Sequence, residues 1–374
     1  MENVSLTIIH GAKLIMFASN NNRNIGLDIY RISAVLVIFM FHSWIHLQCD
    51  YGIFMPFIQM GAIYMTAFFL LSGFVLYLTY QKKDLSNIND VKLFYKKRLI
   101  NILPAYYVVA LLFIVLIGKE SFSENLLLAP VEFLLMQSSF MSIFNVSHNN
   151  GTWFVSCILF CYLIYPFIQE MIKQSGVKTK IVILLLAGFI LLYSPLIVNH
   201  FNTISTYADP FYRILEFMMG VILCSFTEDI QKMKISKYIF SIWAILIEYT
   251  VLIIVVTAAV EADFHVNDYM LYNWFTLPLF ILLLLSMYGA DFKIHSSKIT
   301  DYICKISYTF FLVQIFAWKS TSYIIDNIGI DTNIVKILLS LLLCILFSIL
   351  VHELVEKPTS VILNRRNKIA TDNQ

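Results

Sequence analysis

The chain has 374 residues, of which 59% are hydrophobic and 13% are charged, and its net charge is +2. An ordinary soluble domain is about 45–50% apolar and about 25% charged, so this composition excludes a soluble globular enzyme. The small net charge gives no support for a nucleic-acid partner. The sequence therefore predicts an all-α, polytopic membrane protein.

Apolar stretches of about 20 residues, the length that crosses a bilayer core, recur along the whole chain. We interpret residues 1–28 as an N-terminal tail, 29–356 as one membrane domain and 357–374 as a C-terminal tail. Within the domain, 81–98 is expected to be a polar loop, and 126–144 is apolar enough to form a re-entrant or interfacial piece. The ten expected spans lie near residues 29–48, 60–80, 103–117, 152–170, 181–198, 211–226, 239–259, 270–288, 303–318 and 334–352.

The basic residues orient these spans. Twenty of the 26 Lys and Arg residues fall in the two tails and the even-numbered connections, whereas the odd-numbered connections hold only Lys119 and Lys319. Cytoplasmic loops retain positive charge. We therefore expect both termini to be cytoplasmic.

Ionisable side chains inside a span are costly and mark candidate functional sites. The first span carries Arg31 and His42. Eleven residues of helix turn through three full turns and about 20°, and rise roughly 16 Å, so both side chains share one face at different depths. Imidazole suits acid–base catalysis and guanidinium suits phosphate, which makes the pair a candidate site. An interfacial anchor arginine and a packed histidine are the structural alternative.

A block of basic residues, Lys96, Lys97 and Arg98, precedes an expected helix with Pro104 in its first turns. Such a block either anchors the protein at the anionic cytoplasmic surface or binds the phosphates of a nucleotide-like donor such as coenzyme A.

Arg213 and Glu216 lie three residues apart at the external end of the sixth span. They either form an ion pair that locks helices together or contact substrate.

Two features predict packing. Ser72 and Gly73 form a small pair inside an apolar helix, which is typical of close helix contact, and Glu248 in the seventh span is expected to form a hydrogen bond between helices. The six cysteines form no CxxC pair and no cluster with histidine, so neither a disulfide framework nor a metal site is expected.

In order along the chain, these segments resemble the acyltransferase-3 family of integral membrane acyltransferases. The resemblance covers about residues 25–360. It rests on Gly26-Leu27-Asp28, Arg31-x10-His42, FFLLSGF (68–74), KRLINILPAYY (97–107), TWFVSCILFCYLIYPF (152–167), YRILEFMMG (212–220), ISYTFFLVQ (306–314) and LVEKP (354–358).

The resemblance implies a multi-pass plasma-membrane enzyme that transfers an acyl group, most simply acetyl, from cytoplasmic acyl-CoA to a hydroxyl of a cell-surface polysaccharide or its lipid-linked precursor. It implies His42 as the catalytic base. It implies Arg31, Lys97 and Arg98 as ligands of the CoA phosphates. For the acceptor side we expect contacts from Trp153, Arg213 and Glu216. The expected partners are the acyl-CoA, the glycan, membrane lipid and polysaccharide-biosynthesis proteins, without a metal.

The sequence departs from the family pattern at four positions. Asn101 stands where members commonly have a second arginine, Gly151 and Gln314 where they often have histidines, and Thr66 where an acidic residue is frequent. These departures put catalytic competence in question but not the fold. Two alternatives of the same fold therefore remain open, an exporter of polysaccharide intermediates and a non-catalytic membrane sensor.

Overall fold

The computed structural model describes residues 24–118, 121–139, 147–200, 206–262, 269–292, 298–329 and 331–362, and within these ranges every regular element is a helix. The longer helices are α2 (Ile25–Leu47), α4 (Tyr64–Tyr80), α5 (Ile88–Leu116), α6 (Phe122–Phe133), α7 (Trp153–Gln174), α8 (Val177–His200), α9 (Pro210–Ser225), α12 (Ile242–Glu261), α13 (Asn273–Gly289), α14 (Lys298–Leu312), α15 (Gln314–Ile328) and α16 (Asn333–Val351). Short helical segments join them: η1 (Gly52–Phe54), α3 (Met55–Gln59), η2 (Gly61–Ile63), η3 (Gln137–Ser139), η5 (Asn150–Thr152), α10 (Thr227–Lys232), α11 (Ser236–Ile239), η6 (Tyr269–Tyr272) and the π-helix η7 (His352–Glu356). The expected polytopic helical bundle is confirmed.

Eight helices among the described residues are long and apolar enough to cross a membrane, and each corresponds to one of the expected spans. The other two expected spans differ in form. The sixth is α9, a buried helix of 16 residues. The ninth is interrupted at Val313, where α14 ends and α15 begins. The total of ten spans stays a prediction.

The boundaries of several elements differ from those expected. α2 begins at Ile25, four residues early, and the expected tail lies outside the described residues up to position 23. The loop expected at 81–98 is wrong beyond Asn87, because that residue caps a 29-residue helix, α5, that continues into the apolar stretch. Pro104 is consequently in the interior of α5 rather than in its first turns. At the other end of the chain the helix runs on to Ile362.

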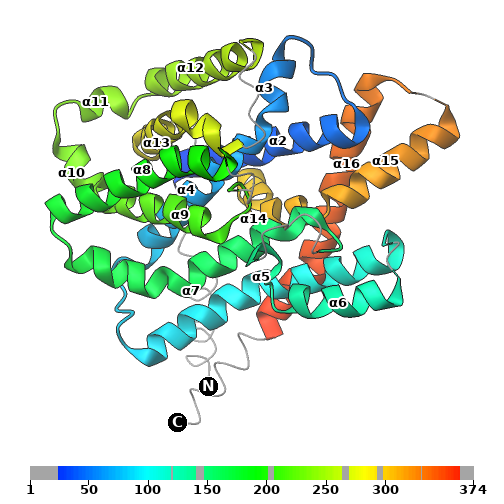
Figure 1. Ribbon diagram of the computed structural model, residues 1–374, viewed down its shortest axis with the longest axis horizontal. Coiled ribbons are helices and arrows are strands. Elements are labelled where there is room, and N and C mark those ends of the chain that lie inside the picture. Colours follow the sequence, from blue (N-terminus) through cyan, green and yellow to red (C-terminus); the bar gives the residue numbers. More distant parts are fainter. Residues whose placement is uncertain are drawn as a thin grey trace, which may run out of the picture.

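α4 and α9 form the centre of the bundle, in closer contact than any other pair (Figure 1). An added Cβ at Gly73 would lie 1.9 Å from the carbonyl oxygen of Phe217, and one at Gly220 would lie 2.0 Å from that of Leu70. The backbones therefore touch, as small residues allow in membrane helices, and the packing expected from Gly73 is confirmed. α2 and α7 pack around this pair, while α8, α12 and α16 expose most of their apolar surface, as lipid-facing helices do.

Contacts between helix ends separate two faces of the bundle. The Lys173 ammonium at the end of α7 donates to the carbonyl of Lys83 beyond α4, and Asn24 at the start of α2 donates to the carbonyl of Tyr288 near the end of α13. Asn333, at the start of α16, accepts from the backbone of Asp50 beyond the other end of α2. The basic connections of α4 and α7 therefore meet at one face. The charge rule predicts that this face is cytoplasmic.

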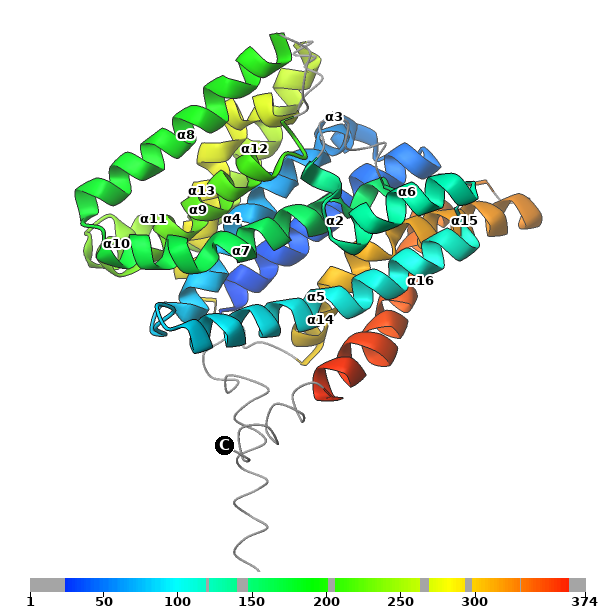
Figure 2. The ribbon, with the colours of Figure 1, turned by 60° about the horizontal axis from the view of Figure 1, so that its bottom comes forward.

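α6 turns back along α5 (Figure 2). Hydroxyls of Tyr106 and Tyr107 in α5 donate to the carbonyls of Glu132 and Phe133 at the end of α6. Tyr106 lies ten residues before the end of α5, a distance of about 15 Å along the helix. The end of α6 therefore packs beside the middle of α5 rather than its end, and the re-entrant or interfacial piece expected at 126–144 stays a prediction.

Candidate active site

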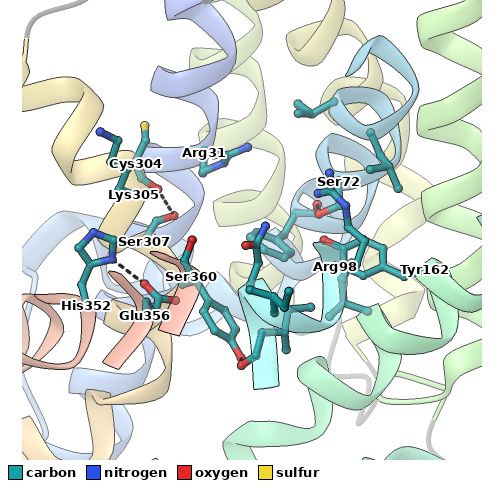
Figure 3. Close-up of a pocket in the computed structure, with 18 of the residues that line it drawn as sticks. Arg31, Ser72, Arg98, Tyr162, Cys304, Lys305, Ser307, His352, Glu356 and Ser360 are labelled. Carbon is teal, nitrogen blue, oxygen red and sulfur yellow. Dashed lines mark hydrogen bonds and ion pairs between the residues drawn. The ribbon is translucent and has the colours of Figure 1, made fainter. Parts of the chain in front are cut away.

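A large cavity of about 710 Å³ opens on the Arg31 side of the bundle (Figure 3). Its walls come from α2, α4, α5, α7 and α14 and from the chain around η7. The basic side chains in the lining are Arg31, Arg98, Lys305, His352 and Lys357. The cavity therefore offers positive charge at the face that carries the basic connections and is predicted to be cytoplasmic.

Two acidic side chains also line this cavity, and both are paired. Nδ1 of His352 lies 2.6 Å from Glu356 in the π-helix. Glu353 accepts from Lys357 at 2.5 Å and from the Tyr302 hydroxyl at 3.0 Å. Both carboxylates are thus neutralised by nearby partners, so Arg31 and Arg98 give the cavity its positive charge toward a ligand.

Arg98 is held by aromatic rings. Its Nη2 donates to the Tyr80 hydroxyl at 3.0 Å, and its guanidinium lies 5.1–5.8 Å from the ring centres of Tyr80, Phe94 and Tyr162. Its Nε is buried without a hydrogen-bond partner among the described residues. An unanswered donor in the wall of a basic cavity suits a phosphate-bearing ligand, because burying such a donor costs about 1–3 kcal/mol.

Of the other two residues expected to bind the donor, one lines this cavity and one does not. Arg31 lines the cavity from α2, between the His352–Glu356 pair and Arg98 in the view of Figure 3, whereas Lys97 does not line it. Asn101, in place of the common second arginine, does line it, as does Lys305, which the sequence reasoning missed. The signal for Lys305 was a basic residue inside a span.

A second cavity, of about 450 Å³, lies toward the other face and contains the expected catalytic histidine. Its lining includes His42, His46, Trp153, Gln314 and Trp318. α2 therefore runs along both cavities, with Arg31 in the lining of the first and His42 in the lining of the second. This arrangement agrees with the shared helix face predicted for these two residues.

His42 is oriented by two neighbours. With the Gln314 amide as placed, Nδ1 of His42 donates to Oε1 at 3.0 Å, which leaves the lone pair on Nε2. The Trp318 ring centre lies 5.3 Å from that of His42 and stacks on His46 at 4.4 Å. A fixed neutral imidazole in a cavity can accept a proton from a hydroxyl.

The chain before α7 supplies another histidine to this cavity. Gly151 lines it without a side chain, but His148, three residues upstream, also lines it. Nδ1 of His148 lies 2.5 Å from Glu132, and Nε2 lies 2.7 Å from Asn125, both on α6. Since both ring nitrogens are engaged, His148 holds α6 against the cavity rather than presenting a free base.

Arg213 and Glu216 line neither cavity. Both are fully buried, and Nη1 of Arg213 donates to the two carboxylate oxygens at 2.9 and 2.7 Å. Thr66 on α4, one of the four departures noted in the sequence, donates to the same carboxylate at 2.8 Å. The geometry is that of an ion pair within α9, which the Thr66 hydrogen bond ties to α4, with Trp153 between the guanidinium and the cavity.

Glu248 behaves as the sequence predicts. The Ser286 hydroxyl on α13 donates to its carboxylate at 2.9 Å, which confirms a hydrogen bond between α12 and α13.

Comparison with known families matches residues 24–353 to the acyltransferase-3 family, described as an acyltransferase domain. No curated protein and no solved structure shows significant similarity to the chain. The match covers both cavities up to the start of η7.

Proposed function

Because the chain belongs to the acyltransferase-3 family and is a multi-pass membrane acyltransferase, we propose that it moves an acyl group, acetyl in the simplest case, from cytoplasmic acyl-CoA to a hydroxyl of a cell-surface polysaccharide or its lipid-linked precursor. The observation that carries the proposal is the pair of cavities on one helix, with a basic cavity around Arg31 and a histidine cavity around His42. In this proposal the enzyme lies in the plasma membrane.

The donor would bind in the basic cavity. Its phosphates would lie near Arg31, Arg98 and Lys305, with Lys97 at the edge of the same surface. The unanswered Nε of Arg98 supports this placement. The thioester end would then extend along α2 toward His42.

The chemistry balances with a single proton carrier. Nε2 of His42 accepts the proton of the acceptor hydroxyl as its oxygen attacks the thioester carbonyl, so that a C–O bond forms and the C–S bond breaks. The proton then passes to the departing thiolate. Trp153 would form a wall for the acceptor, whereas Arg213 and Glu216 would act behind that wall.

Replacing His42 by Ala tests the proposal. The acetyl content of surface glycan should fall to that of cells lacking the protein, while the amount of protein in the membrane stays unchanged. Unchanged acetylation would remove His42 as the base. Loss of acetylation together with retained binding of acetyl-CoA by the purified variant would separate catalysis from donor binding.

A further inference from the structure

The boundary between the two cavities is thin. On three helices the residues that line one cavity lie within one turn of residues that line the other. The pairs, with the outer residue first, are Met65 and Phe68 on α4, Trp153 and Phe154 on α7, and Phe311 and Tyr308 on α14. Three residues of helix rise only about 4.5 Å.

Two phenylalanine rings fill this boundary. The ring centres of Phe154, which lines the basic cavity, and Phe311, which lines the histidine cavity, lie 4.1 Å apart in an edge-on arrangement. Phe68 adds a third ring 6.4 Å from Phe154. On the far side, the Phe311 ring centre lies 6.3 Å from that of His42. The rings therefore lie between the lining of the basic cavity and His42.

We propose that Phe154 and Phe311 form a hydrophobic gate that seals the basic cavity from the histidine cavity until a ligand displaces the rings. The inference rests on the proposed function only in naming that ligand, the acyl end of the donor. Apolar constrictions exclude water and ions by dewetting, and rings without hydrogen bonds can turn about two side-chain bonds without leaving a polar group unpaired. A membrane protein that opens cavities at both faces requires such a seal to keep the bilayer impermeable.

The seal can be measured without turnover, by access of a thiol reagent. Ile315 lines the histidine cavity and Ser307 lines the basic cavity, so Ile315→Cys and Ser307→Cys place one probe on each side. Inverted membrane vesicles holding the full chain would be treated with a small cationic methanethiosulfonate. Labelling of each site is quantified by peptide mass spectrometry, against the chain with only its native, buried cysteines.

We expect Ser307→Cys to react rapidly and Ile315→Cys to be protected while both rings are present. Adding Phe154→Ala or Phe311→Ala should speed labelling of Ile315→Cys at least 10-fold. Phe310→Ala is the matched control, because Phe310 is a buried phenylalanine of α14 next to Phe311 but packs on Phe39, 5.5 Å away, and lines neither cavity. It should leave the rate unchanged.

Two results would overturn the gate. One is rapid labelling of Ile315→Cys with both rings intact. The other is continued protection in both ring-deleted chains while Ser307→Cys still reacts, because the barrier then lies elsewhere. Testing Phe154→Ala, Phe311→Ala and the milder Phe154→Leu ensures that the result does not depend on a single variant that fails to fold. If labelling refutes the gate, the proposed acyl transfer is unaffected. If acetylation is unchanged in the His42 variant, the labelling result is unaffected.

Discussion

The hydrogen bond between His42 and Gln314 gives the sharpest test of the proposed chemistry. Gln314→Leu removes the amide oxygen that accepts from Nδ1 of His42 at 3.0 Å but keeps a side chain of similar size at a position that is 2% exposed. The imidazole then loses the contact that fixes its tautomer. Packing against Trp318 remains and keeps the ring in the cavity.

The size of the effect follows from one hydrogen bond. A neutral hydrogen bond contributes about 0.5–1.5 kcal/mol, which corresponds to a rate reduction of about 2- to 13-fold. Loss of a general base costs about 10²- to 10⁴-fold. We therefore expect Gln314→Leu to reduce kcat modestly and His42→Ala to reduce it far more, with little change in the KM for acyl-CoA in Gln314→Leu, since Gln314 lines only the histidine cavity.

The assay is the initial rate of transfer from radiolabelled acetyl-CoA to surface glycan in isolated membranes, normalised to the amount of protein. Gln314→Glu keeps an acceptor oxygen and should retain more activity than Gln314→Leu. In the double variant the Gln314 change should cost nothing further once His42 is gone. Full activity in Gln314→Leu, or a loss equal to that in His42→Ala, would refute the assigned role.

Three further predictions concern the donor cavity and the packing of the bundle. Lys305→Ala should raise the KM for acyl-CoA roughly 5-fold at low salt, and the difference should shrink at high ionic strength because salt screens the attraction; a salt-independent change would contradict a charge effect. Arg213→Met should lower the free energy of unfolding in detergent by about 3–5 kcal/mol, because it leaves the Glu216 carboxylate buried without its partner. The double variant Arg213→Met with Glu216→Leu should recover most of that loss. If Arg213→Met instead keeps full stability and abolishes transfer, Arg213 acts on substrate. Gly73→Ala should prevent recovery of folded protein by size-exclusion chromatography, because its Cβ would strike a backbone carbonyl, whereas Gly188→Ala on the open surface of α8 should behave as the parent.

Periodicity and charge predicted the features that lie on a single helix. Arg31 and His42 share α2, so their common face could be calculated from helix geometry. Gly73 indicated close helix packing without indicating which helix would be its partner. α5 was harder, because the polar residues after Asn87 resemble a loop in composition although they continue a helix.

Contacts between residues far apart in the chain could not be predicted from the sequence. Gln314 lies 272 residues from His42, and it is the first residue of α15, directly after the break that follows α14. At the position of Gln314 the sequence showed a departure from a family pattern, whereas the structure shows an acceptor for the His42 proton. Arg213 could be read as an ion pair or a substrate ligand, because spacing cannot show that Trp153 stands between it and the cavity.

The backbone contact between α4 and α9 has a consequence for how the protein can change over time. No side chain lies between Gly73 and the backbone of Phe217 or between Gly220 and the backbone of Leu70. A larger residue at either glycine would strike backbone atoms, and a smaller side chain on the other helix could not make room for it. The helices around it can drift, since α8, α12 and α16 present mostly apolar surface to lipid, where one aliphatic side chain serves as well as another. Divergence among descendants of this chain should therefore concentrate on the rim of the bundle and leave a fixed central axis.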